Sequence, residues 1–519
     1  MKKNTMATAI VAGLAGVAGI ANISTAVNLN PDGVGQVLLY PYYTVNDGNT
    51  TALSVVNTTD SGKAVKVRFL DAVNSREVLD FNLYLSEYDV WTAGIFSRAA
   101  DGPANIVTSD TSCTVPGIED GIFQLPTLAD GRRFFPFRTS FFTDGLGTSP
   151  TRTRSGYVEM IEMGSIPYDS PIGFGFYLTH INGRPADCSF LEGAWLASGT
   201  PGGSGIWFNN PLLDLEAPTG GLFGGAAIVD VVDGTYINYN AEAIDGFSAS
   251  IQHTGPGSIF PNLGSANGPV AGAVSSYVFD RGRLITSNWL TAGGGGANAV
   301  SAVLMREAMF NEYEVDPDLG AASEWVVTLP TRKLYVTGAT TFAAPFTAGW
   351  SGCERVSGRI YNREEDTFQI LDFSPGGLRT AICREANVLW FTRTPVAANA
   401  ISPIHGETGG LAIPTYLQLF GIIQKTFNNG WFWLGFYDEN AINSVGALDP
   451  LLRPALVETA PGASGADRYF GLPAIGYWAL RVINVNQGAG LQASYGGAYP
   501  HRASRACFKG TFGNSAPCD

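Results

Sequence analysis

AVKVRFLD (64–71) and VLDFNLYL (78–85) are the two stretches that decide the fold class. In the first stretch, apolar residues alternate with the cations Lys66 and Arg68. In the second, leucine and phenylalanine alternate with polar residues and a tyrosine. Alternation with a period of two predicts β-strands that each have one buried face.

The residues around these two stretches extend the β pattern. NDGN (46–49) and DSG (60–62) are turn sequences at the spacing of a β-sandwich. The whole chain of 519 residues has 64 Gly, 29 Pro and 12% aromatic residues, which is typical of many tight turns between aromatic-rich strands. We therefore predict a mainly β protein whose residues 27–100 form an antiparallel, immunoglobulin-like β-sandwich.

Two further β-rich regions follow, a middle region (101–340) with a disulfide and a C-terminal region (341–519) with two. In the middle region, residues 226–240 predict a hairpin with a type I′ turn at Asp233-Gly234. A short helix is predicted from Asn298, with apolar residues continuing at helical spacing as far as Phe310. The fold prediction therefore includes one or two short helices.

Residues 1–26 have the pattern of a signal peptide. Lys2 and Lys3 precede an apolar stretch, and Ser24 and Ala26 place small residues before a cut at Val27. The alternative is an uncleaved anchor, because the apolar stretch approaches the length of a membrane span. We predict cleavage, no membrane span in the mature chain, and an extracellular or cell-surface location, with the periplasm as an open alternative.

The charge of the chain bears on its partners. The formal net charge is −14, and removal of Lys2 and Lys3 with the leader makes it more negative. Binding to polyphosphates needs a dense cationic surface, so the charge disfavours nucleic acid as a partner. Self-association, or attachment to a cell-surface or extracellular polymer, is the partner prediction that remains.

Six cysteines in an exported chain predict three disulfides. Fifteen pairings exist for six cysteines. The order of the residues along the chain favours pairing each cysteine with its nearest neighbour: Cys113 with Cys188, Cys353 with Cys383, and Cys507 with Cys518. The chain has only four His and no CxxC pair, which argues against a metal site.

Catalytic motifs are missing from the sequence. It contains no GxSxG elbow, P-loop, Rossmann fingerprint or haem-attachment motif, so no cofactor is predicted. The alternative catalytic residues are Glu364, Glu365 and Glu385, which a Cys353–Cys383 disulfide would bring into one neighbourhood as a glycosidase-type acid/base pair. Arg363 and Arg384 lie beside them, and this favours ion pairs.

Trp431 and Trp433 share one face of the predicted strand GWFWLGFY (430–437) and are the alternative ligand-binding residues, as a platform on which sugars stack. Phe432 and Leu434 occupy the opposite face. Apolar residues on both faces favour a strand that is buried on both sides, with the tryptophans in the core.

Several segments together resemble a family of exported, β-rich proteobacterial proteins. The segments that carry the resemblance are GQVLLYPYYT (35–44), GYVEMIEMG (156–164), SEWVVTLPT (323–331), YNREE (361–365), ICREANVLWF (382–391), GLPAIGYW (471–478) and ASYGGAYPHR (493–502). The resemblance implies export and a β-rich fold. It implies no particular activity and no catalytic residues.

The signal peptide, the β pattern, the acidic charge and the lack of catalytic motifs favour a structural or adhesive role without catalysis. The alternative is a secreted carbohydrate-active enzyme or a glycan-binding protein, functions that aromatic-rich β folds often support. A cleft with two carboxylates and exposed tryptophans would favour this alternative.

Overall fold

The computed structural model describes residues 26–118, 125–268, 272–369, 381–397, 399–419, 422–437, 454–462, 465–484, 493–509 and 516–518. Of the expected signal peptide, only Ala26 lies within the described residues. The described chain consists mainly of antiparallel β-sheets, which confirms the predicted fold class. It also contains five short helices where one or two were expected: α2 (Phe174–Leu178), α3 (Cys188–Trp195), α4 (Ile206–Asn209), α5 (Gly295–Leu304) and α6 (Arg332–Tyr335).

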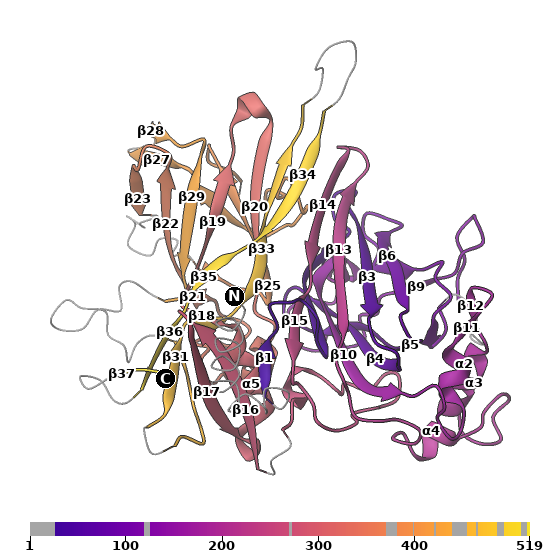
Figure 1. The fold of residues 1–519 in the computed structure, drawn as a ribbon. Coiled ribbons are helices and arrows are strands. Elements are labelled where there is room, and N and C mark those ends of the chain that lie inside the picture. The colour runs from indigo at the N-terminus through magenta and orange to yellow at the C-terminus, as the bar shows by residue number, and fades with distance from the viewer. Residues whose placement is uncertain are drawn as a thin grey trace, which may run out of the picture.

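A nine-stranded sheet forms the centre of the molecule (Figure 1). In spatial order its strands are β17 (Arg283–Leu290), β16 (Ala273–Asp280), β1 (Val27–Leu29), β15 (Glu242–Asp245), β2 (Val37–Thr44), β10 (Ser155–Ile166), β4 (Gly62–Asp71), β5 (Glu77–Leu85) and β8 (Cys113–Val115). The two stretches that decided the prediction are β4 and β5, and they pair with each other. All neighbouring strands are antiparallel except β1 and β16.

A six-stranded sheet packs on one face of the nine-stranded sheet. Its order is β14 (Thr235–Asn240), β13 (Leu222–Asp230), β3 (Thr50–Asn57), β6 (Val90–Ser97), β7 (Ala104–Val107) and β9 (Phe134–Pro136). Side chains of both sheets share one hydrophobic cluster, with Phe69 and Phe81 from one sheet and Val55 and Trp91 from the other. Both sheets contain strands from beyond residue 100; the immunoglobulin-like topology stays a prediction.

Two five-stranded sheets form the C-terminal half. One has the order β23 (Thr367–Gln369), β22 (Ser357–Asn362), β29 (Asn429–Gly435), β19 (Ala308–Glu314) and β35 (Arg502–Ser504). The other has the order β26 (Leu411–Pro414), β25 (Ala386–Thr392), β20 (Ala321–Thr328), β33 (Ile475–Val482) and β34 (Tyr495–Pro500). Their facing side chains share a core, in which the rings of Trp325 and Phe432 lie 5.0 Å apart.

The remaining strands form small sheets. They are β30 (Ala455–Val457), β31 (Asp467–Phe470), β36 (Ala506–Lys509) and β37 (Ala516–Pro517), and the pairs β11 (His180–Ile181) with β12 (Arg184–Pro185), β18 (Met305–Arg306) with β32 (Leu472–Pro473), β21 (Glu354–Arg355) with β24 (Ala381–Ile382), and β27 (Tyr416–Leu419) with β28 (Ile422–Thr426). The two halves of the molecule lie side by side, with β34 next to β14 (Figure 1).

The expectation that β4 buries only one face is incomplete, because both faces of this strand are buried. Lys66 and Arg68 are only 0% and 4% exposed. The reason is a further layer on the nine-stranded sheet: one hydrophobic cluster joins it to α2–α4, and another joins it to α5 and the C-terminal half. The buried cations are tolerated because they are paired, with 2.7 Å between Lys66 Nζ and Asp80 Oδ2.

Two local predictions need correction. The hairpin of β13 and β14 forms, but residues 231–234 make its loop and only Gly234 has a positive φ, so the turn is not type I′. The helix α5 begins at Gly295 and ends at Leu304, after which residues 308–314 form β19. The apolar spacing after Leu304 belongs to a strand that packs against two neighbouring strands.

The three predicted disulfides are confirmed. Cys113 pairs with Cys188, Cys353 with Cys383, and Cys507 with Cys518, at sequence separations of 75, 30 and 11 residues. The first links β8, at the edge of the nine-stranded sheet, to the start of α3. In the described residues, no helix is long and apolar enough to cross a membrane.

We expect each disulfide to stabilise the fold by an amount that rises with the logarithm of the length of the loop that it closes. Replacing both Cys353 and Cys383 with Ala should lower the free energy of unfolding by about 3.5 kcal/mol, and replacing both Cys113 and Cys188 by about 4.5 kcal/mol. Urea unfolding of the two double variants and of the unmodified protein measures this. Variants as stable as the unmodified protein would contradict the expectation.

Candidate functional site

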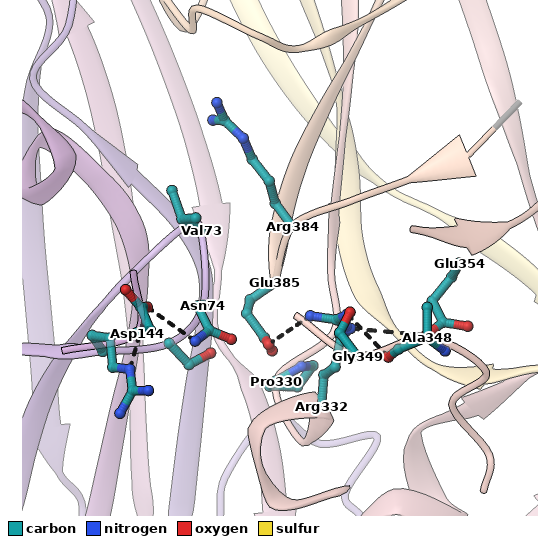
Figure 2. A network of polar contacts seen from close by, with 12 residues as sticks. Val73, Asn74, Asp144, Pro330, Arg332, Ala348, Gly349, Glu354, Arg384 and Glu385 are labelled. Carbon is teal, nitrogen blue, oxygen red and sulfur yellow. Dashed lines mark hydrogen bonds and ion pairs between the residues drawn. The ribbon is translucent and has the colours of Figure 1, made fainter. Parts of the chain in front are cut away.

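Glu385, one of the three candidate catalytic carboxylates, lies in the core. It precedes β25 and is 0% exposed. Its Oε1 accepts a hydrogen bond of 3.2 Å from Arg332 Nη1, and Arg332 Nη2 donates to the carbonyl oxygen of Gly349 at 3.0 Å. Figure 2 shows Glu385 turned toward Arg332, whereas Arg384 points away; Arg384 instead pairs with Glu407.

Further buried charges adjoin Glu385. The Lys333 Nζ lies 3.4 Å from Glu159 Oε1, and Arg68 lies between Glu159 and Glu77 at 2.7 Å from each. Burial raises the pKa of Glu385 to about 7, although the Arg332 charge opposes the increase. Burial and the like charge of Arg68 lower the pKa of Lys333 to about 8. These perturbed groups are buried in ion pairs that join the nine-stranded sheet to α6, which indicates a structural role.

Glu364 and Glu365 occupy a different environment from Glu385. Both are exposed in the turn between β22 and β23, where Glu364 donates its backbone N–H to Asn362 Oδ1 at 3.0 Å. Their neighbour Arg363 pairs with Glu314 rather than with either of them. A glycosidase needs its two carboxyl groups on either side of one substrate bond. The structure therefore does not bring the three candidate carboxylates to a common surface.

The sequence analysis missed a buried carboxylate–histidine–hydroxyl arrangement. His405 Nδ1 lies 2.6 Å from Glu324 Oε2, and His405 Nε2 lies 2.9 Å from the hydroxyl of Tyr477. This order of groups resembles that of a hydrolase triad. All three side chains are buried, and burial raises the pKa of Tyr477 well above its usual value. The arrangement links β20, β33 and the loop before β26 and presents no accessible nucleophile.

One group of potential metal ligands occurs in the described residues: Asp467, Cys507 and Cys518. Both sulfur atoms belong to the disulfide between Cys507 and Cys518, so they are not thiolates. Only the carboxylate of Asp467 remains as a ligand of the usual kind.

Trp431 and Trp433 lie on the outer face of their sheet, which corrects the expectation of a strand buried on both sides. Phe432 and Leu434 point into the core at 0% exposed, whereas Trp431 is 41% exposed and Trp433 is partly exposed. The alternation was correctly recognised in the sequence. What the sequence does not show is that no other layer covers this face in the described part of the chain.

Neighbouring strands complete this surface. Tyr361 of β22 lies directly across from Trp431, and their rings stack with centroids 4.2 Å apart and planes 6° apart. Arg359 lies over Trp433 with its guanidinium carbon 5.3 Å from the ring centre. We call Tyr361, Trp431 and Trp433 the aromatic face.

On the other side of β29 from β22, the neighbouring strand is β19. Glu312 lies across from Trp431, and Phe310 lies across from Trp433. The Trp433 ring folds over Gly435, where a Cβ atom would lie 2.3 Å from the ring. Only glycine at this position lets the ring lie flat on the sheet. The arrangement offers aromatic rings beside a carboxylate and a guanidinium on an accessible surface.

The chain was compared with protein-family models, with curated proteins and with solved structures, and no match was found in any of the three. The aromatic face and the buried charges are therefore interpreted from their own geometry.

We expect Glu385 to make stability depend on pH. Its pKa is about 7 in the folded protein and about 4.3 when unfolded. The folded state thus binds the proton more tightly, and stability falls as the pH rises through this interval. The Glu385→Gln variant lacks this titrating group. From pH 5 to pH 8, its free energy of unfolding should therefore rise by about 2 to 3 kcal/mol relative to that of the unmodified protein.

Urea unfolding at several pH values measures this difference. Glu364→Gln is the matched control, because Glu364 is exposed; its stability difference from the unmodified protein should not vary with pH. A pH-independent difference for Glu385→Gln would show that Glu385 does not titrate in this interval.

Proposed function

We propose that this protein is exported and acts without catalysis, as an adhesion protein that attaches to an extracellular or cell-surface polysaccharide through the aromatic face. The observation that carries the proposal is the stacked pair of Tyr361 and Trp431, in which Trp431 is exposed and Tyr361 is partly exposed. Exposed aromatic rings attract ligands with apolar faces and polar edges, and sugars have both.

The geometry of the pair defines how a sugar would bind. Tyr361 covers one side of the Trp431 indole, so a sugar ring stacks on the other side. On that side, Glu312 is the cross-strand neighbour of Trp431 and its carboxylate can accept hydrogen bonds from sugar hydroxyl groups. On the Trp433 side, Arg359 supplies a donor. Stacking provides most of the affinity, and the polar groups orient the ligand.

Export agrees with several features of the chain. Three disulfides are typical of oxidising compartments. The basic and apolar pattern of residues 1–26 is that of a signal peptide, and the resemblance to exported proteobacterial proteins points the same way. Self-association, the other partner prediction from the sequence, stays a prediction.

The alternative of a carbohydrate-active enzyme gains no support from the candidate carboxylates, because Glu385 is buried against Arg332 and Glu364 and Glu365 lie on an exposed turn. An activity assay can distinguish the two functions. If the protein turns over a polysaccharide, and if Glu364→Gln or Glu365→Gln abolishes this turnover while the fold stays intact, the alternative replaces the proposal.

Replacing Trp431 with Ala should weaken binding to the polysaccharide at least tenfold, because the stacking surface is lost. Affinity electrophoresis in gels containing soluble cellulose, chitin or mannan derivatives measures the loss. Phe279→Ala is the matched control: Phe279 is 72% exposed but lies on β16 of another sheet. Equal retardation of Trp431→Ala and the unmodified protein would refute a role for the aromatic face.

Export with cleavage should leave Val27 as the first residue. The intact mass of the protein isolated from its native host should correspond to residues 27–519 with six oxidised cysteines. Cell fractionation should find this form outside the cytoplasm. A mass that retains Met1, or free thiols in the native protein, would contradict the expectation.

A further inference from the structure

The outer face of the six-stranded sheet contains a hollow of about 650 Å³. Its lining comes from β3, β6, β13 and β14, with residues 107–109 and Arg132 at one side. The volume falls within the range of small-molecule sites in proteins. This hollow lies on a different sheet from the aromatic face and shares no residue with it.

Small side chains in two adjacent rows create the hollow. In one row, Ala227, Ala52 and Gly94 lie side by side on three strands. In the next row, Gly225 lies beside Ser54. Side chains of ordinary size at these positions would fill the space. The floor of the hollow therefore depends on small residues from three distant parts of the chain.

The fold does not require glycine at position 94. A Cβ added there would meet only atoms of Val107, the nearest at 3.6 Å, which is an ordinary contact. By contrast, a Cβ at Gly224 would lie 2.2 Å from the Tyr40 hydroxyl. Glycine inside a strand weakens the strand and often marks a place where a ligand approaches closely. Packing therefore does not explain the glycine at position 94.

The walls of the hollow supply aromatic and polar groups. Tyr236 and Phe223 are 57% and 42% exposed. The side-chain amides of Asn238 and Asn240 point outward from β14 and have no hydrogen-bond partner among the residues that the structure describes. Thr92 and Ser109 add hydroxyl groups at the other side. Rings beside free amides and hydroxyls suit a ligand with many hydroxyl groups.

Charge and main-chain geometry narrow the choice of ligand. Arg132 is the only cation of the lining, and its Nε and Nη2 donate to Asp130 Oδ2 at 2.9 and 2.7 Å, which compensates its charge. The strands of the floor, β3, β6 and β13, are each paired on both sides, so their backbones are not available for strand addition. A ligand must therefore be recognised through side chains. Because these side chains carry no uncompensated charge, an uncharged ligand suits the hollow.

We propose that this hollow is a binding site for an uncharged oligosaccharide. Tyr236 and Phe223 stack against sugar rings, Asn238 and Asn240 bond to their hydroxyl groups, and the floor of Ala52, Gly94 and Ala227 admits the ligand. Together with the aromatic face it would give each molecule two sugar-binding surfaces, although the hollow does not depend on that face.

Isothermal titration calorimetry with cellohexaose, chitohexaose and hexagalacturonic acid tests the proposal. All proteins carry Trp431→Ala, so that the aromatic face does not contribute. We expect binding of at least one neutral hexasaccharide, and at least a tenfold loss of affinity in Gly94→Val and in Ala227→Leu, which fill the hollow. Valine suits a strand, and thermal unfolding confirms that both variants fold.

Val90→Leu is the matched control, because Val90 is an exposed residue of β6 outside the hollow; its affinity should be unchanged. Tyr236→Ala is a second variant, and it removes a wall without filling the hollow. No binding of either neutral probe, a preference for hexagalacturonic acid, or equal affinities in the filled variants would overturn the proposal. These results do not affect the electrophoresis experiment with Trp431→Ala, which tests the aromatic face. Each of the two proposals can therefore be refuted without the other.

Discussion

The pairing of Arg68 with Glu77 and Glu159 is the interaction on which the architecture depends. The three groups lie on the nine-stranded sheet at the face that meets the C-terminal half, and each is at most 6% exposed. An unpaired charge at such a place would cost several kcal/mol. Because each charge has a partner, the sheet can be covered on both faces, and a chain with 15% charged residues builds a deep molecule of several layers.

The sequence determines which residues alternate along a strand, but not what lies against each face. The alternation in β4 correctly predicted a strand, yet Lys66 is as buried as Val67 because distant segments cover both faces. The opposite error occurred at Trp431, where apolar residues on both faces suggested a core strand and the outer face is open. The disulfides followed from residue order because each joins neighbouring cysteines.

The candidate sites differ in how visible they are in the sequence. Trp431 and Trp433 stand out as two tryptophans at a spacing of two, and the same alternation in β22 could have added Arg359 and Tyr361. The hollow has no such local signal. Ala52, Gly94 and Ala227 are ordinary small residues in separate strands, and they acquire meaning only when the register of β3 places them side by side.

The position of β1 has a consequence for folding. This strand lies between β15 and β16, with Asn28 across from Asp245 and beside Tyr277. In this sheet, β1 therefore lacks both neighbouring strands until the chain has extended past residue 241, and the second of them until it has extended past Asp280. Contacts between such distant residues slow folding, because a long loop must close first. A polypeptide that folds slowly stays extended longer, and passage through a narrow translocation channel, as the export that we propose would require, needs an extended chain.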